Sequence, residues 1–140
     1  MKDTASVITP RRCISPVSVA DNTAAVGQII DRQGFESLTY IIATGSVADA
    51  DATFAVLLEE GDASNLSDAV AVADEALIGT EALAGFQFDD DNETRKLGYV
   101  GGKRYTRLTI TPSGNASAAL IAAVAILGYP HLAPTANPPA

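Results

Sequence analysis

Apolar and polar residues alternate along most of this sequence of 140 residues. The strongest example runs from residue 104 to 111, where Thr106, Leu108 and Ile110 fall on one face. A period of two is that of a β-strand with one buried face. A Gly-Gly step at residues 101–102 separates this strand from a shorter one before it. Two short strands are therefore expected around the glycines.

The same pattern predicts further strands elsewhere in the chain. They are expected at residues 17–19, 24–30, 38–42, 53–60, 76–78 and 118–127. The last of these follows a turn at residues 112–115 and is expected to form a hairpin with the strand before it. Its alanines and the spacing of Leu120, Val124 and Leu127 also suit a helix, which stays open as an alternative.

These strands predict an all-β protein with a single antiparallel β-sandwich and extended N- and C-terminal arms. The sandwich is expected over residues 19–128, after an extended arm over residues 1–18 and before a proline-rich tail over residues 129–140. Residues 63–85 are expected to form a loop with a short helical turn. The predicted core consists of Leu38, Tyr40, Ile42, Phe54, Val56, Leu58, Leu108, Ile110, Ile121 and Val124.

Charge is segregated along the sequence. Residues 49–93 contain many carboxylates and no Lys or Arg, whereas five basic residues follow between 95 and 107. Adjacent antiparallel strands could pair the two blocks inside the molecule. A charged docking face is the functional alternative. The net charge of −8 argues against a broad nucleic-acid-binding surface.

Candidate chemistry is sparse, and we expect no catalytic, metal or cofactor site. Cys13 has no partner for a disulfide or a zinc site and is expected to be buried. His131 lies in the proline-rich tail, with no orienting acid beside it for a catalytic triad. The acidic cluster at residues 89–93 lacks the spacing of an EF-hand and suits a solvated hairpin tip. The glycines at residues 98–102 suit a turn rather than a phosphate loop.

One group of aromatic and basic residues could contact a partner. Tyr99, Arg104 and Tyr105 could form a sugar-binding or protein-binding patch, although packing within a sheet explains them as well.

No run of about 20 apolar residues is present, so a membrane span is not expected. The N-terminus does not have the pattern of a signal peptide, and the protein is expected to be made in a cytoplasm.

Three segments, at residues 57–64, 97–107 and 128–134, resemble small structural proteins that are encoded with tailed-phage head genes. The length and layout are similar to the dimeric jelly-roll cementing, or decoration, proteins of short-tailed phage heads. The resemblance extends over most of the chain from about Asp21. It implies that the sandwich is jelly-roll-like, and it implies a virion protein on the capsid exterior that bridges neighbouring subunits of the major capsid protein against internal DNA pressure.

The resemblance implies two partners, the major capsid protein and a second copy of this chain in a homodimer. We expect Arg11, Arg12, Arg104 and Arg107 to be the candidates for capsid contact, with the N-terminal arm and the tail as anchors. Two other functions stay open, a structural protein of the tail or fibre base and a carbohydrate-binding β-sandwich module. An enzyme is not expected, because the sequence offers no base, metal set or cofactor loop.

Overall fold

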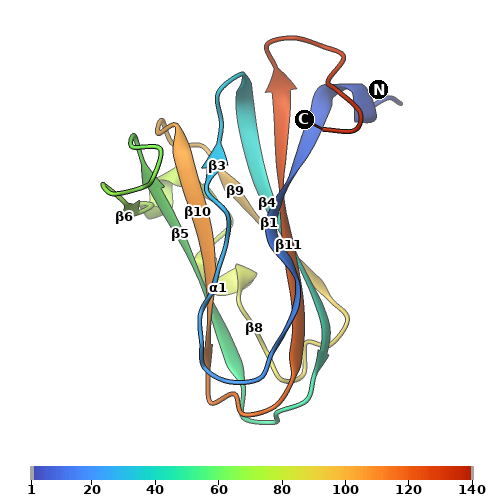
Figure 1. The fold of residues 1–140 in the computed structure, drawn as a ribbon, viewed down its shortest axis with the longest axis vertical. Coiled ribbons are helices and arrows are strands. Elements are labelled where there is room, and N and C mark those ends of the chain that lie inside the picture. The colour runs from blue at the N-terminus through green and yellow to red at the C-terminus, as the bar shows by residue number, and fades with distance from the viewer. Residues whose placement is uncertain (1, 140) are drawn as a thin grey trace.

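The computed structural model describes residues 2–139 and confirms the antiparallel β-sandwich (Figure 1). Sheet A has the strand order β1 (Ile8–Val19), β11 (Ala119–Pro130), β4 (Phe35–Val47), β9 (Thr94–Tyr99) and β7 (Leu77–Ile78). Sheet B has the order β2 (Ala25–Val26), β10 (Tyr105–Ser113), β5 (Thr53–Gly61) and β6 (Val70–Ala71), with β3 (Ile30–Asp31) on β10 and β8 (Phe86–Gln87) on β5. The helical pieces are η1 (Ala5–Val7), η2 (Asp74–Ala76) and α1 (Glu81–Ala84).

The core lies between the two sheets, and strand alternation selects it. Every second residue of the central strands is buried, and all predicted core residues except one belong to this core. The exception is Val124, which is 40% exposed. On β11 the buried positions are the odd-numbered ones from Ala119 to Leu127. Val124 is three residues from Ile121, and residues at an odd separation cannot share one face of a strand.

The hairpin predicted at residues 112–115 is wrong. Residues 119–130 do form a strand and not a helix, but β11 pairs with β1 and β4 in sheet A, whereas β10 belongs to sheet B. Both edges of β10 are already occupied, by β5 on one side and by β2 and β3 on the other. The chain therefore crosses between the sheets after β10, and it does so again between β9 and β10.

The separate N-terminal arm is also wrong for residues 8–18. These residues form most of β1, which pairs with β11 along its length. Thr9, Cys13, Ile14 and Val19 of this strand are buried. Burial of these side chains makes the strand part of the sandwich rather than an appendage.

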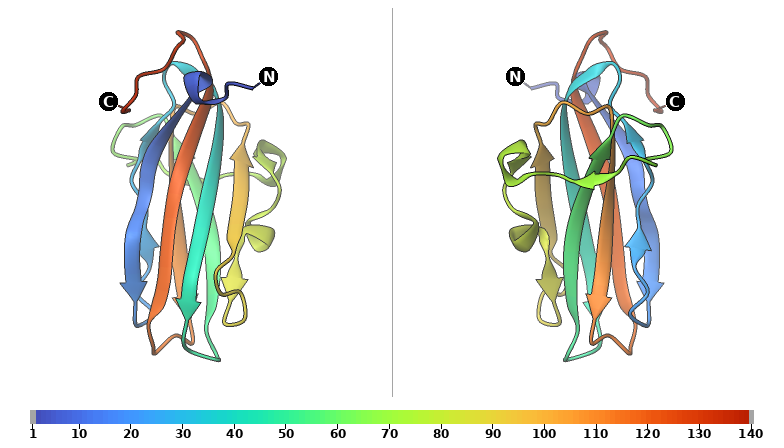
Figure 2. Two further views of the ribbon diagram at one scale, coloured as in Figure 1. Left: turned by 90° about the vertical axis from the view of Figure 1, so that its right-hand side faces the viewer. Right: turned by 90° about the vertical axis from the view of Figure 1, so that its left-hand side faces the viewer.

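The tail begins inside sheet A, because β11 continues to Pro130. Beyond it, the His131 amide donates to the Gly34 carbonyl at 2.8 Å, and the Thr135 amide donates to the Ser6 carbonyl at 2.9 Å. The tail is thus folded back against η1, and the two chain ends lie at the same end of the sandwich (Figure 2). Met1 and Ala140, the outer residues of the predicted arm and tail, lie outside the described residues.

Candidate docking face

The outer face of sheet A is the most apolar surface built by the long strands, and we call it the sheet A face. Its outward positions follow from the strand pairing and the alternation of buried and exposed residues. They are Pro10, Arg12 and Ser18 on β1, Leu120, Ala122, Val124 and Ile126 on β11, Thr39, Ile41, Ala43 and Gly45 on β4, Thr94, Lys96 and Gly98 on β9, and Ile78 on β7.

Only Arg12 and Lys96 carry charge among these positions, and both lie at the sides of the face. One row of the sheet runs Arg12, Val124, Ile41 and Lys96, with each residue paired to the next across neighbouring strands. Val124 and Leu120 on β11 are 40% and 47% exposed. The face therefore has an apolar centre and a cation on either side.

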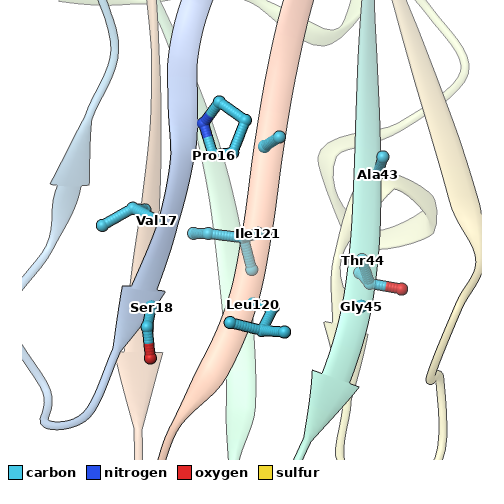
Figure 3. A pocket seen from close by; sticks show the side chains of 9 residues that line it. Pro16, Val17, Ser18, Ala43, Thr44, Gly45, Leu120 and Ile121 are labelled. Carbon is cyan, nitrogen blue, oxygen red and sulfur yellow. The ribbon is translucent and has the colours of Figure 1, made fainter.

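The lower half of the sheet A face contains a shallow recess of about 390 Å³. Its walls come from three neighbouring strands, β1, β11 and β4. Figure 3 labels the residues of these strands that line the recess. Leu120 lies over Gly45, where an added Cβ would approach the Leu120 Cβ to 2.9 Å. Glycine at this position thus lets the leucine lie flat along the sheet and leaves the recess open.

Charged residues on sheet B and in its loops pair within the molecule. Arg107 and Glu59 face each other across β10 and β5, with Nη2 and Oε1 3.2 Å apart. The Lys103 ammonium lies 2.7 Å from an Asp62 carboxylate oxygen. Arg107 with Glu59 thus confirms the expected pairing of the two blocks across adjacent strands at this position, and Lys103 with Asp62 joins the blocks between the loops next to these strands.

Two of the four predicted capsid-contact residues are engaged inside the molecule. Arg104 donates to both carboxylate oxygens of Asp31 at 2.9 Å and also to the Gln33 side chain. This hydrogen bonding from Arg104 is the main cause that lowers the pKa of Asp31. Arg107 is held by Glu59 on sheet B.

The other two candidates lie on β1. Arg11 is half-buried on the inward side of the strand, where its Nη1 has no hydrogen-bond partner in the described structure. Arg12 is exposed on the sheet A face, and its Nη1 donates to the Ser15 hydroxyl at 2.8 Å. The structure therefore brings only Arg12 of the four onto this face.

The predicted tyrosine patch is divided between core and surface. Tyr99 is 2% exposed, its hydroxyl donates to Glu60 at 2.5 Å, and the Arg32 guanidinium lies 4.9 Å from its ring centre. Burial, with the hydrogen bond to Glu60 as a second cause, raises the pKa of Tyr99 to about 12. Arg104 stacks on the half-buried Tyr105 ring at 5.0 Å. Packing accounts for Tyr99, which is not available to a ligand.

The remaining candidates for chemistry have structural partners. Asp90 and Glu93 flank Arg95 at 3.3 and 2.6 Å, and Asp91 accepts a hydrogen bond from the Val47 amide. Within residues 2–139, no three or more His, Cys, Asp or Glu side chains are grouped to hold a metal ion. Cys13 is buried, as expected. No helix in the described part of the chain has the length and apolar character to cross a membrane.

Sequence reasoning missed the sheet A face because it treated β11 as a source of core residues. The available signal was the second, even-numbered set of apolar residues on that strand, Leu120, Val124 and Ile126. A strand that is apolar on both sides either has both sides covered within the protein or presents one to a partner. No element of sheet B covers this side, as the left view in Figure 2, which faces sheet A, shows.

Comparison with known proteins identifies the fold and no family. No family model matches the sequence, and no curated protein matches it. Among solved structures, the xylan-binding module CBM15 is similar over 93% of this chain and 95% of the module, with 14% identity and a TM-score of 0.51.

Two phage-derived proteins are also among the structural neighbours. The PBSX exported protein XepA matches over 86% of this chain with 17% identity and a TM-score of 0.49, and this chain spans only 37% of XepA. The SPBc2 prophage-derived protein YomS matches over 84% of this chain and 94% of its own length, with 13% identity and a TM-score of 0.43. At these identities the likeness extends to a β-sandwich fold alone.

Proposed function

We propose that this protein is a structural component of a phage virion that binds the outside of the capsid and cements neighbouring subunits of the major capsid protein. The observation that carries the proposal is the sheet A face, an apolar surface of four long strands with charge only at its sides. Contiguous exposed apolar surfaces of this kind mark sites of protein association. The proposed role is mechanical and not catalytic.

The charges favour a partner with carboxylates around an apolar centre. The chain carries a net charge of −8, yet the sheet A face presents Arg12 and Lys96 and no acidic residue among its outward positions. An acidic rim on the capsid surface would complement these two cations and fix the orientation of docking. This arrangement replaces the predicted role of Arg104 and Arg107, which are already paired.

Docking by a face also replaces the predicted docking by free arms. β1 is the edge strand of sheet A, and Pro10 and Pro16 with two register shifts interrupt its edge. Proline and bulges protect an edge strand from pairing with another chain. The tail is tied to η1 through Thr135. Neither segment is a loose strand, so we assign the contact to side chains of the sheet A face.

A cement must hold two capsid subunits at once, and a homodimer on a two-fold axis would meet this need. Two copies related by a two-fold axis present the same face twice. Linking two such faces raises the effective concentration of the second contact and strengthens attachment without new interactions. The homodimer is part of the proposal and would be measured by light scattering of the free protein and by its stoichiometry on heads.

The test is to place a carboxylate in the apolar centre of the sheet A face. Val124→Glu would place a carboxylate opposite Arg12 in the apolar centre of the face. This carboxylate would neutralise one of the two cations, repel an acidic rim on the partner and lose its hydration in the contact, so docking should weaken. Val26→Glu is the matched control, because Val26 is 57% exposed on β2 of sheet B. We expect Val124→Glu to lose occupancy on purified heads with unchanged thermal unfolding. Equal occupancy of the two variants would contradict docking by this face.

The second candidate function is that of a carbohydrate-binding module. The favouring observation is the similarity of fold to a xylan-binding module over nearly the whole of both chains. The two candidates are separated by where the protein is found. A position on the shell of a purified virion supports the cement, a position at the tail supports a tail or fibre-base protein, and absence from the virion with binding to polysaccharide supports the module.

A further inference from the structure

A recess of about 670 Å³ lies at the end of the sandwich where the two chain ends meet, and we call it the terminal recess. Its apolar part is formed by Val7 and Ile8 from the start of the chain and by Pro130 from the end of β11. Its polar side chains are those of Thr4, Glu36, Ser37 and His131, with the hydroxyl of Tyr129. A site of this size, with a mainly apolar lining and a few converging polar groups, is typical of pockets for small ligands.

The walls of the terminal recess are fixed by hydrogen bonds on both sides. On one side, the His131 backbone amide donates to the Gly34 carbonyl, and Nε2 of the His131 ring lies 2.5 Å from Glu36 Oε1. On the other side, the Thr135 hydroxyl donates to the Ile8 carbonyl at 2.7 Å. The tail between these two anchors therefore forms a wall of the recess, which is preformed in the free protein.

Tyr129 stands at the edge of this recess in an unusual conformation. Its φ is 49°, in the left-handed region that costs a residue with a bulky side chain free energy, and its side chain is 77% exposed. Burial of the ring in the core does not offset this free-energy cost, because the ring is exposed. Non-glycine residues in such conformations cluster at ligand sites, where the surroundings hold a side chain ready for contact.

We propose that the terminal recess binds a neutral sugar ring. The exposed Tyr129 ring offers a flat apolar surface with a polar hydroxyl at its tip, which suits the apolar face of a sugar and its hydroxyl groups. The Glu36 carboxylate accepts hydrogen bonds, His131 and Ser37 can donate or accept, and all three line the same recess. The Glu36 carboxylate, in a protein of net charge −8, disfavours an anionic ligand.

This inference names the site of the carbohydrate-binding function that stands second above, and it does not depend on docking to a capsid. The terminal recess is lined by η1, the start of β4 and the tail. The recess on the sheet A face is lined instead by the far parts of β1, β4 and β11. A sugar and a capsid subunit could therefore be bound at the same time.

The experiment titrates the full-length, isotope-labelled protein with xylose, glucose, galactose, N-acetylglucosamine and xylo-oligosaccharides, and follows the backbone amide resonances. We expect saturable shifts confined to residues 4–8, 34–37 and 128–133 with at least one of these sugars. A titration with N-phenyl-1-naphthylamine, a neutral apolar probe, is run in parallel. Shifts of the same residues with this apolar probe and with none of the sugars would overturn the proposal and assign the recess to an apolar protein partner.

Two variants and one control locate the site. Tyr129→Asn removes the ring while keeping a residue that tolerates the left-handed backbone, and Glu36→Gln removes the carboxylate. We expect each to weaken sugar binding at least about tenfold, the loss of roughly one good interaction. Tyr105→Asn is the matched control, because Tyr105 lies on β10 under Arg104 and outside the terminal recess.

The outcomes separate the site from the function. Binding that is lost in Tyr129→Asn and kept in Tyr105→Asn supports the terminal recess. Binding that is lost in Tyr105→Asn alone overturns the recess as the site and leaves the carbohydrate-binding function standing. Absence of binding to every sugar overturns both.

Discussion

The hydrogen bond between Tyr40 and Thr106 is the sharpest test of how the two sheets are held together. Tyr40 lies on β4 of sheet A and Thr106 on β10 of sheet B, and both are fully buried. The Tyr40 hydroxyl and Thr106 Oγ1 are 2.6 Å apart. Burial raises the pKa of Tyr40 far above its ordinary value, so the hydroxyl stays protonated. The pair therefore joins the sheets through the core.

Removing either hydroxyl leaves the other buried without this partner. Tyr40→Phe and Thr106→Val should each lower the free energy of unfolding by about 1–3 kcal/mol, the cost of an unsatisfied buried polar group. Unfolding entropy of roughly 2.1 cal/mol/K per residue converts each loss into a fall of about 3–10 °C in Tm for a chain of this length. The double variant leaves two apolar side chains of similar shape and should be less destabilised than the two losses added together.

The assay is urea and thermal unfolding of the four proteins, followed by circular dichroism in the far and near ultraviolet. The coupling free energy from the double-mutant cycle is the quantity to measure. Losses that add without coupling would refute the reasoning, since they would mean that each hydroxyl has another partner in the folded protein. A Tyr40→Phe variant as stable as the original protein would refute it as well.

Four further predictions follow from the same structure. Burial raises the pKa of Cys13 to about 12, so iodoacetamide should label this residue only when the protein unfolds. Gly27→Ala should cost about 1–3 kcal/mol in urea unfolding, because a Cβ at Gly27 would lie 2.7 Å from the Cys13 sulfur. Hydrogen bonding from Arg104 lowers the folded-state pKa of Asp31, so this carboxylate stabilises the fold above its ordinary pKa of 3.8 and loses that contribution as pH falls through the folded value. Arg104→Gln should therefore make the free energy of unfolding fall less steeply as the pH is lowered through the acid range. Deleting residues 1–16 should abolish cooperative unfolding, because most of β1 is lost; retained folding with normal occupancy on heads would show that this strand is dispensable.

The long strands β4, β5 and β10 and the core were predictable, because they depend on a local period of two. The strand expected at residues 24–30 is present only as the short β2 and β3. The buried sets on β4, β5 and β10 follow directly from the alternation in the sequence. Strand pairing was not predictable in the same way. The turn at residues 112–115 reads as a hairpin, but the choice between pairing with β10 and crossing to the other sheet depends on which edges distant strands already occupy. That information is not local to the turn.

The N-terminal segment shows a second limit. Pro10 and Pro16 indicated an arm, since proline cannot donate to a strand ladder. The structure accommodates both in β1 because the strand is at an edge and is interrupted by register shifts after Arg12 and after Ile14. Prolines in an edge strand are compatible with the sheet. Sequence alone does not reveal whether a strand is at an edge.

The candidate site was missed for a related reason, and the charges explain where it lies. The segregation of acidic and basic residues suggested a charged docking face, yet the register of β10 against β5 sets Arg107 opposite Glu59 and uses these charges within sheet B. A partner that covered sheet B would have to remove such pairs from water, which costs more than it returns unless new partners are supplied. Covering the centre of the sheet A face requires no charge to be removed from water. Burial of the exposed Leu120 and Val124 side chains lowers the free energy in proportion to the apolar area that is removed from water. The same segregation that suggested a charged contact therefore favours docking through the opposite face, whose centre carries no charge.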